Sequence, residues 1–435
     1  GWYDALNGLP GIFGSSTAET MELKRLVDYM FKLINNFEDM SYKLVLPIEL
    51  YEFTTAINNE IEKWSNKKND YNYWKQANKL KEKYREKVFW GFDGQEKVIS
   101  ISDLQDYLFN ISKKLEQAVK YASNADYGMY VTYYYYLPVE YKETGSISKD
   151  GYPYIQVSKF ERKMLPPFLE GQVRAMKLLN TNQAKDLHSQ VKASELFDNK
   201  LKMYRLNGDL SKMPDAIGRA RAFTPGWLEN GSIWLHMEYK YLLELLKSGL
   251  YDEFYQSLKN CLIPFHDPEL YGRSILENSS FIMSSSNPDQ KNHGRGYVAR
   301  LSGSTAEFLN IWSIMVYGKT PFKVDDGNLI FKPEPVLKTE FFTSSEQEVI
   351  LQEVEVKGKY VIPENSFACR LLGETLLVYH NPERKDIYPT SAHISHYSLQ
   401  TKKGKVIEVN MSYLSAEYAS MIRSGKIKAI DVYFS

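Results

Sequence analysis

Residues 287–306 (NPDQKNHGRGYVARLSGSTA) combine basic side chains with small glycine and hydroxyl residues that open a predicted helix. Backbone N–H groups at a helix start attract negative charge, glycine lets the backbone approach a ligand closely, and an arginine fork matches two phosphate oxygens. The segment therefore predicts an oxyanion site, although a basic surface loop before an ordinary capped helix would show the same residues. The residues that could take part are His293, Arg295, Arg300, Ser302 and Gly303.

The N-terminal segment places one acid among aromatic residues. Asp4 follows Trp2 and Tyr3 and precedes a glycine-rich loop. A carboxyl group flanked by aromatic faces is partly desolvated, which favours its protonated form and suits it to donate a proton near neutral pH. Aromatic faces also suit sugar rings, so we expect Trp2 and Tyr3 to contact a saccharide. The alternative is a loop acid whose oxygens accept hydrogen bonds from nearby backbone N–H groups.

Residues 223–240 predict a loop that runs into a helix, because apolar residues recur at helical spacing from Ile233 onward. Glu229 and Asn230 lie at the mouth of this helix, where they could bind a sugar. His236 follows about two turns after Glu229 and close to the same face. A single histidine on an apolar helix can equally be a core residue whose hydrogen bonds are satisfied.

Taken in order, the N-terminal, central and basic segments resemble the catalytic half of the inverting phosphorylases of glycoside hydrolase family 94, the cellobiose phosphorylase type. Residues 1–7 (GWYDALN) are similar to the family's Asp-Trp-Asn-Asp-Gly-Leu-Asn loop, and residues 15–19 (SSTAE) to the Gly-Glu-Ser helix start that follows it. The family's Glu-Asn…His helix and Gly-Arg-Gly…Leu-Thr-Gly-Thr-Ala loop are similar to residues 229–236 and 294–306. The resemblance covers residues 1–320, but within them about residues 85–150 have no counterpart.

The resemblance implies a role for each matching residue. Asp4 would be the general acid, and Trp2 would contact the sugar. Gly1 stands where the family has an aspartate and Tyr3 replaces an asparagine, which leaves the preferred sugar open. The positions that would hold phosphate are His236, Ser302, which replaces a threonine but keeps the hydroxyl, and the backbone of Gly303.

The implied reaction is phosphorolysis, with inversion, of a β-linked glucoside or β-oligoglucan. Asp4 would protonate the leaving oxygen while inorganic phosphate, held also by Arg295 or Arg300, attacks the anomeric carbon and forms α-glucose 1-phosphate. No metal or organic cofactor is implied, since phosphate is the co-substrate. An inverting β-glucanase or a transglycosylase on the same scaffold is the alternative; a hydrolase would need a second carboxylate to activate water, and Glu229 is the candidate. A non-catalytic carbohydrate-binding protein is a further alternative.

The composition excludes several classes of partner. Lys+Arg and Asp+Glu both number 54, so the chain has no global field that would attract nucleic acid or an anionic membrane. No apolar run is long enough to span a bilayer, and no signal peptide is recognised. Because Cys261 and Cys369 are the only cysteines, we expect a cytoplasmic protein without a disulfide framework. The 33 tyrosines suit either sugar stacking or helical packing.

Periodicity predicts mostly helices over residues 1–326, with a β-rich insertion near 124–157. Short β-rich runs over residues 327–435 predict a C-terminal β-sandwich or jelly-roll module. The expected fold class is therefore mainly α, and the resemblance implies an (α/α)6-barrel-like catalytic domain. The helices are expected near 16–37, 46–64, 70–88, 103–121, 166–179, 183–196, 230–248, 251–260 and 304–317.

The expected barrel would be incomplete at its N-terminus. Family members carry further donor-site residues upstream of the acid loop, so the resemblance implies that an upstream part of the same protein or a second chain completes it; homo-oligomer formation is a further alternative. In the C-terminal module, His380, His393 and His396 could suggest a metal site. Their spacing matches no closed tetrahedral arrangement, and solvated loop histidines are the alternative.

Overall fold

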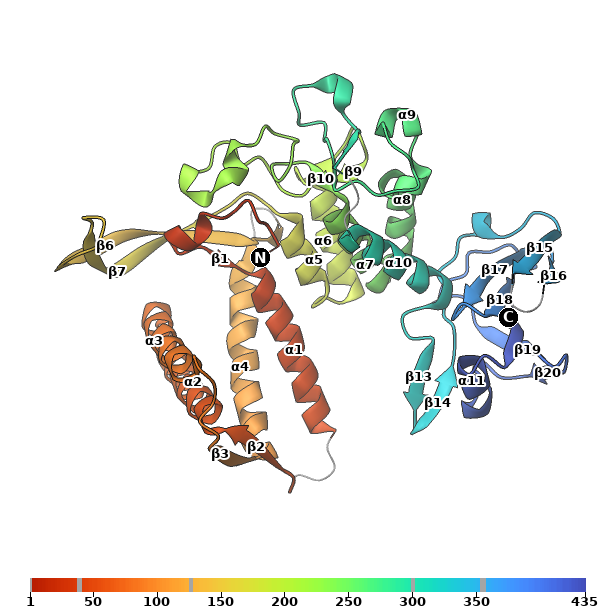
Figure 1. Ribbon diagram of the computed structural model, residues 1–435, viewed down its shortest axis with the longest axis horizontal. Coiled ribbons are helices and arrows are strands. Elements are labelled where there is room, and N and C mark those ends of the chain that lie inside the picture. Colours follow the sequence, from red (N-terminus) through yellow and green to blue (C-terminus); the bar gives the residue numbers. More distant parts are fainter. Residues whose placement is uncertain (1, 37–40, 125–127, 299–301, 353–356) are drawn as a thin grey trace. The chain divides into compact units, whose positions relative to one another are not determined.

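The computed structural model describes residues 2–36, 41–124, 128–298, 302–352 and 357–435 (Figure 1). The chain divides into two compact units. The first comprises Gly1–Glu244 and Ser257–Leu301, and the second comprises Leu245–Gln256 and Ser302–Ser435. The division therefore falls about 25 residues before the boundary expected near residue 326, because the helix that begins at Ser302 belongs with the C-terminal strands.

The first unit carries a bundle of the four long helices α1 to α4 (Figure 1). Apolar residues at helical spacing on α1 and α4 form its core, and Ser100 and Asp103 cap α4 with reciprocal hydrogen bonds. α2 and α3 form a helical hairpin beside them, and two short strands pair at its base. The elements are α1 (Ala18–Asn35), β2 (Lys43–Pro47), α2 (Ile48–Lys67), α3 (Asp70–Val88), β3 (Glu96–Ser100) and α4 (Ile101–Ala122). The core residues are Val27, Ile34, Ile101, Leu108 and Leu115.

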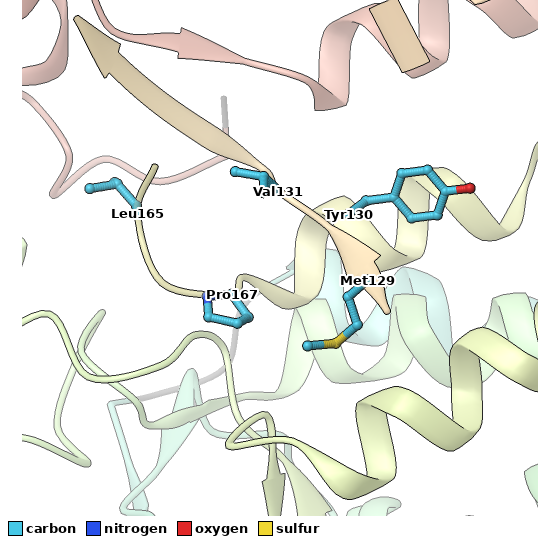
Figure 2. A pocket seen from close by; sticks show the side chains of 5 residues that line it. All are labelled: Met129, Tyr130, Val131, Leu165 and Pro167. Carbon is cyan, nitrogen blue, oxygen red and sulfur yellow. The ribbon is translucent and has the colours of Figure 1, made fainter. Parts of the chain in front are cut away.

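A long β-hairpin follows the bundle, as its aromatic and β-branched sequence predicts. It is formed by β6 (Tyr133–Ile147) and β7 (Pro153–Met164), and β1 (Ser15–Ser16) pairs with the base of β6. The short strands β4 (Ser123–Asn124) and β5 (Met129–Tyr130) precede it. A small pocket lies near its base (Figure 2). The pocket is lined by Met129, Tyr130, Val131, Leu165 and Pro167. None of these side chains is charged, so the pocket is not a candidate site for acid catalysis or anion binding.

The remainder of the first unit contains shorter helices and two-residue strands joined by long loops. Its interior is rich in aromatic residues, and Tyr204, Tyr239, Tyr241 and Tyr271 are fully buried. Packing of the interior therefore explains part of the high tyrosine content. The helices are α5 (Leu169–Met176), α6 (Thr181–Ala193), α7 (Leu235–Lys247), α8 (Tyr251–Cys261) and α9 (Pro268–Tyr271). The end of α7 from Leu245 and the part of α8 up to Gln256 belong to the second unit. The strands are β8 (Phe197–Asp198), β9 (Met203–Tyr204), β10 (Ile233–Trp234), β11 (Phe281–Ile282) and β12 (Gly296–Tyr297).

The second unit is built on a five-stranded sheet of order β17-β18-β21-β19-β20. Buried apolar residues lie on both faces of its central strands, and the pair β18 and β21 is parallel whereas the other pairs are antiparallel. The elements are α10 (Ser302–Tyr317), β13 (Phe322–Asp325), β14 (Asn328–Phe331), β15 (Gln347–Gln352), β16 (Lys357–Ile362), β17 (Ser366–Leu371), β18 (Thr375–His380), β19 (Ile394–Thr401), β20 (Val406–Val409), α11 (Ala416–Arg423) and β21 (Ile427–Phe434).

The expected mainly α, (α/α)6-barrel-like fold is wrong. The protein is 41% helix and 26% strand, and its described residues contain many small antiparallel sheets but no barrel. The helices occur close to the predicted positions, but α1 to α4 pack with one another as a bundle. Helical periodicity defines which face of a helix is buried, but not which element covers it. That is why well-placed helices did not predict the architecture.

The β-sandwich or jelly roll expected for the C-terminal module is also wrong. A jelly roll is antiparallel throughout, whereas β18 and β21 run parallel and are separated in the chain by β19, β20 and α11. Residues 416–423 form a helix that buries Ala419 and Ile422, and we did not expect a helix here. This helix forms the last part of the connection between the two parallel strands.

Two of the three C-terminal histidines lie on strands and not on solvated loops. His380 of β18 and His396 of β19 stack on the two faces of Tyr433 of β21, with ring centroids 4.4 and 4.3 Å apart. His380 Nε2 also lies 2.7 Å from a carboxylate oxygen of Asp431. In the described part of the chain, no group of three or more His, Cys, Asp or Glu side chains could hold a metal ion. These histidines therefore belong to the packing of the sheet.

The two cysteines lie in different units, and both are buried free thiols. Among the helices that the structure describes, none combines the length and the apolar character needed to cross a lipid bilayer.

Candidate active site

The acid loop, residues 2–7, is held by residues more than two hundred positions away in the sequence. The backbone N–H of Ala5 donates a hydrogen bond to Glu229 Oε2 at 2.9 Å. The indole N–H of Trp2 donates to Nδ1 of His236 at 3.3 Å. The structure therefore brings together the N-terminal segment and the central segment that the sequence singled out.

Asp4 is exposed, while its two neighbours along the chain are buried. The desolvation that the flanking aromatic residues were expected to produce at Asp4 is therefore absent. Glu229 is the buried carboxyl of the pair. Burial raises the pKa of Glu229, and the charge of Asp4 raises it further, whereas the Ala5 N–H and the charge of Arg219 act in the opposite direction. Glu229 and Asp4 thus lie within electrostatic range of each other.

The two aromatic residues before Asp4 point to different environments. The Trp2 ring packs edge-on against Trp234 and His236, with ring centroids 5.4 and 5.8 Å apart. Tyr3 is buried and donates its hydroxyl proton to the carbonyl of Leu206 at 2.8 Å. The hydroxyl of Tyr3 is therefore bonded in the protein interior, whereas the Trp2 ring contacts Trp234 and His236. We did not expect Trp234 from the sequence, although it lies two residues before His236.

Glu170, on the first turn of α5, is a buried acid that the sequence analysis missed. It accepts a hydrogen bond from the hydroxyl of Tyr133 at 2.7 Å and another from the backbone N–H of Trp2. Burial raises its pKa, and the nearby Arg174 guanidinium, 3.7 Å away, opposes that shift. Glu170 and Glu229 therefore hold backbone N–H groups on either side of Asp4. A single glutamate in a helix gives no sequence signal for such a role.

A loop over residues 213–222 braces the acid loop from another side. The carbonyl of Ala5 accepts from the N–H of Ala220 at 2.9 Å, and Oδ1 of Asn7 accepts from the N–H of Arg219 at 3.1 Å. Gly218 has φ +116°, and a Cβ there would come within 2.5 Å of Asn7 Oδ1. Only glycine therefore allows the two loops to approach this closely.

Asn230, which we expected to bind substrate, is fully buried and its amide is occupied by the protein. Its Oδ1 accepts from the N–H of Leu210 at 2.9 Å, and its Nδ2 donates to the carbonyl of Phe223 at 2.8 Å. A second buried asparagine, Asn207, donates to the carbonyl of Glu229 at 3.1 Å. Both asparagines therefore hold the loops that position Glu229.

The three-stranded sheet β10-β11-β12 connects the central and basic segments. Its register pairs Ile233 with Ile282 and Ile282 with Gly296, so β10 and β12 run in the same direction. His236 follows β10 and Arg295 precedes β12, so the two residues leave the sheet at opposite ends. Arg295 is exposed and lies against Gly272, where a Cβ would come 2.8 Å from Arg295 Nε. The sheet does not place Arg295 beside His236.

The other predicted phosphate ligands lie at or beyond the end of the first unit. Arg300 and the side chain of Ser302 lie outside the described residues. Gly303 is in the first turn of α10, which belongs to the second unit. The assembly of these residues with His236 into a phosphate site stays a prediction.

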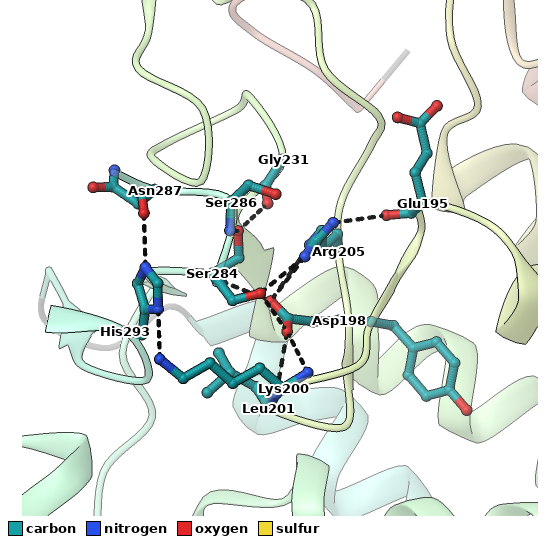
Figure 3. A network of polar contacts seen from close by, with 12 residues as sticks. Glu195, Asp198, Lys200, Leu201, Arg205, Gly231, Ser284, Ser286, Asn287 and His293 are labelled. Carbon is teal, nitrogen blue, oxygen red and sulfur yellow. Dashed lines mark hydrogen bonds and ion pairs between the residues drawn. The ribbon is translucent and has the colours of Figure 1, made fainter. Parts of the chain in front are cut away.

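His293 is buried in a polar network that links residues 195–205 with residues 284–293 (Figure 3). Lys200 Nζ lies 2.9 Å from Nδ1 of its ring, and Nε2 lies 2.7 Å from the carbonyl oxygen of Asn287. A lysine ammonium can only donate, so the ring accepts at Nδ1 and donates from Nε2. His293 thus has both ring nitrogens occupied and serves the interior of the protein.

Asp198 is the centre of the same network (Figure 3). It is fully buried and accepts from the backbone N–H and the hydroxyl of Ser285 at 2.7 and 2.8 Å, and it lies 3.3 Å from the Arg205 guanidinium. Burial opposes ionisation, but these hydrogen bonds and the arginine charge lower the pKa of Asp198. The network is fully paired, which fits a structural role.

No protein-family model matches the chain, and no curated protein matches it. Among solved structures, 28 chains match, and one is an uncharacterized conserved protein from Thermus thermophilus. That protein is 11% identical, with 62% of this chain and 47% of its own covered and a TM-score of 0.26. The present chain thus spans about half of that neighbour's length, and a likeness this low defines neither fold nor activity.

Proposed function

We propose that this protein is an inverting phosphorylase that cleaves a β-linked glucoside or β-oligoglucan with inorganic phosphate and releases α-glucose 1-phosphate. One observation carries the proposal. The loop that bears Asp4 is joined by hydrogen bonds to two residues far along the chain. Ala5 donates to Glu229, 224 residues later, and Trp2 donates to His236, 234 residues later. These are the acid, the sugar-site acid and the phosphate-site histidine of the motifs that the sequence resembles.

Asp4 is the proposed general acid. Its carboxyl is exposed, while the backbone on both sides is fixed by buried carboxylates, so it can reach a glycosidic oxygen without losing its position. In the reaction, Asp4 gives its proton to the glycosidic oxygen as the bond from that oxygen to the anomeric carbon breaks. A phosphate oxygen forms the new bond to the anomeric carbon from the opposite face, and the configuration inverts. Phosphate is already a nucleophile, so no second carboxylate is required.

His236 is the proposed phosphate ligand of the first unit. Trp2 donates to its Nδ1, so the neutral ring carries its proton on Nε2. An Nε2–H donor suits a phosphate oxygen. The roles of Arg300, Ser302 and Gly303 stay predictions from the resemblance, and Arg295 leaves the sheet at the end opposite His236. The rings of Trp2 and Trp234 offer apolar surface to a glucose unit.

An inverting β-glucanase is the second candidate, because Asp4 and Glu229 are close enough for one charge to act on the other. Glu229 would then activate water, as the second carboxylate of inverting hydrolases does. Two features count against this role. Glu229 already accepts the Ala5 N–H, and its burial and raised pKa disfavour the ionised form that a base needs.

The test is a panel of β-1,2-, β-1,3- and β-1,4-linked glucosides incubated with and without orthophosphate, with sugar phosphate and free glucose measured separately. We expect sugar phosphate only when orthophosphate is present. In Asp4→Asn we expect a rate at least about a hundredfold lower, because the proton donor is lost. Asp150→Asn, in the exposed turn of the β6–β7 hairpin, is the control and should leave the rate unchanged. Glucose release without phosphate would favour the hydrolase, and no turnover of any glucoside would contradict both.

A further inference from the structure

Five aromatic side chains gather on the first unit, outside the residues assigned to catalysis. They come from the end of the 3-10 helix η1 (Leu9–Ile12), from the start of α3 and from the β6–β7 hairpin. Ring centroids are 5.0 Å apart for Phe13 and Phe160, 5.6 Å for Trp74 and Phe160, and 5.9 Å for Tyr71 and Trp74. We call this the aromatic cluster; its members are Phe13, Tyr71, Trp74, Tyr136 and Phe160.

The two outer members of the cluster stay open to solvent. Phe13 is 45% exposed and Trp74 is 46% exposed. In the part of the chain that the structure describes, the indole N–H of Trp74 has no hydrogen-bond partner. Phe13 has φ 55°, a left-handed conformation that a bulky residue rarely adopts. The exposed Phe13 ring therefore gains little free energy from burial that could offset its backbone strain. Such strain often occurs at ligand-binding positions.

The cluster is continuous with the acid loop. Phe13 follows Asp4 by nine residues, and the segment between them is fixed by hydrogen bonds from the N–H of Gly8 to the carbonyl of Ile217 and from the N–H of Gly14 to the carbonyl of Leu9. On the other side, the hydroxyl of Tyr71 donates to the carbonyl of Val157 at 2.6 Å and fastens α3 to the hairpin. In Figure 1, the red N-terminal segment lies against the base of the β6–β7 hairpin. A braced segment of nine residues therefore links the cluster to the acid loop.

We propose that the aromatic cluster is a saccharide subsite that binds glucose units of an oligoglucan distant from the bond that is cleaved. The inference rests on the proposed function and extends it to a preference for longer chains. The apolar C–H face of a pyranose ring packs on an aromatic face, and the free indole N–H of Trp74 can donate to a sugar hydroxyl. The end of η1, the start of α3 and the β6–β7 hairpin together supply this surface.

The test measures binding and turnover separately. Calorimetry without phosphate compares β-1,2-, β-1,3- and β-1,4-linked glucose hexamers, each with its own dimer. In the wild-type protein we expect one hexamer to bind about tenfold more tightly than its dimer, a difference that stacking of one or two rings supplies. Trp74→Ala should remove that difference and raise KM for phosphorolysis of the hexamer. It should leave kcat/KM for the dimer unchanged.

Two controls separate this role from packing of the bundle. Trp90→Ala removes another aromatic ring near the end of α3, 94% exposed and outside the cluster, and should change neither constant. Trp74→Phe keeps the ring and should retain most of the preference for the hexamer. If no hexamer binds better than its dimer, or if Trp74→Ala keeps the preference, the subsite is wrong. The protein could instead prefer the hexamer, lose that preference in Trp74→Ala and turn over no glucoside. This result would support the saccharide subsite and contradict only the proposed phosphorylase activity.

Discussion

Asp4 owes its position to hydrogen bonds that its chain neighbours make. Trp2 donates its backbone N–H to Glu170, and Ala5 donates its own to Glu229. Both acceptors are buried carboxyl groups, so losing either bond would leave a buried polar group without its partner, which is costly. The catalytic carboxyl proposed here is therefore exposed on a rigid backbone, which suits a group that must meet a substrate at a fixed angle.

The hydrogen bond from Trp2 to His236 gives a prediction at the scale of one atom. Trp2→Phe keeps an aromatic ring but removes the indole N–H that fixes the tautomer of His236. We expect KM for phosphate to rise by about threefold to tenfold, because Nε2 no longer carries the proton in every molecule. Initial rates over a range of phosphate concentrations measure this. Trp234→Phe is the matched control, since the indole of Trp234 donates to the carbonyl of Leu228 instead. An unchanged KM in Trp2→Phe would contradict the role given to this hydrogen bond in phosphate binding.

Glu238 gives a prediction about pH and stability. It is fully buried on α7, accepts the N–H of Tyr204 at 2.8 Å, and burial raises its pKa from 4.5 to about 8. Between these values the unfolded chain ionises Glu238 while the folded protein keeps it protonated. The stability it contributes is thus present below pH 4.5 and is lost as the pH rises towards 8.

Glu238→Gln removes this titration. Relative to the variant, the wild-type protein should lose on the order of 3 kcal/mol of unfolding free energy between about pH 5 and about pH 8.5. Urea unfolding of both proteins at the two pH values measures the difference. A gap between wild type and variant that stays constant with pH would contradict the assignment.

At the residue scale, the sequence could predict only part of the site. The order of the motifs led to Asp4, Glu229 and His236, and the structure brings these segments together. It could not tell that Tyr3 would be buried between Tyr133 and Phe168 while Trp2 faces His236. Adjacent aromatic residues look equivalent in a sequence, because burial is decided by partners that lie far away along the chain.

At the element scale, a glycine substitution tests whether the loop over residues 213–222 supports the acid loop. Gly218 and Gly94 both have positive φ, but a Cβ at Gly218 would strike Asn7 whereas nothing lies within 4 Å of a Cβ at Gly94. We expect Gly218→Ala to cost about 3 kcal/mol of unfolding free energy and to lower kcat, because the brace must move away from the acid loop.

Gly94→Ala isolates the backbone strain and should cost about 1 kcal/mol with no effect on kcat. Urea unfolding and initial rates, measured on both variants, separate the two effects. Equal losses of activity in the two variants would mean that the brace does not position Asp4.

The elements themselves were largely predictable, and their partners were not. The expected helices at 70–88 and 251–260 correspond to α3 and α8 within one residue, and the tyrosine-rich run forms the expected hairpin. Local propensity and periodicity can be recognised within short windows of sequence. The bundle formed by α1 to α4 and the parallel pairing of β18 with β21 depend on long-range contacts, for which a single sequence gives no signal.

At the scale of the whole molecule, the residues proposed for one reaction are spread over a long stretch of chain. Asp4 and the residues that hold its loop belong to the first unit, whereas Gly303 lies in the first turn of α10, in the second. The resemblance predicted the chemistry of these positions together with a barrel to hold them, and the barrel is wrong. The function therefore rests on the site alone, since a fold does not define an activity.

The central claim is that Asp4 and phosphate act on one glycosidic bond from opposite faces. Proton NMR of the first product released from a β-linked glucoside in phosphate buffer tests it most directly, because it resolves the anomers of glucose 1-phosphate. We predict the α-anomer with the wild-type protein and no sugar phosphate with Asp4→Asn. Release of β-glucose 1-phosphate, or α-glucose 1-phosphate formed at an undiminished rate by Asp4→Asn, would contradict the account.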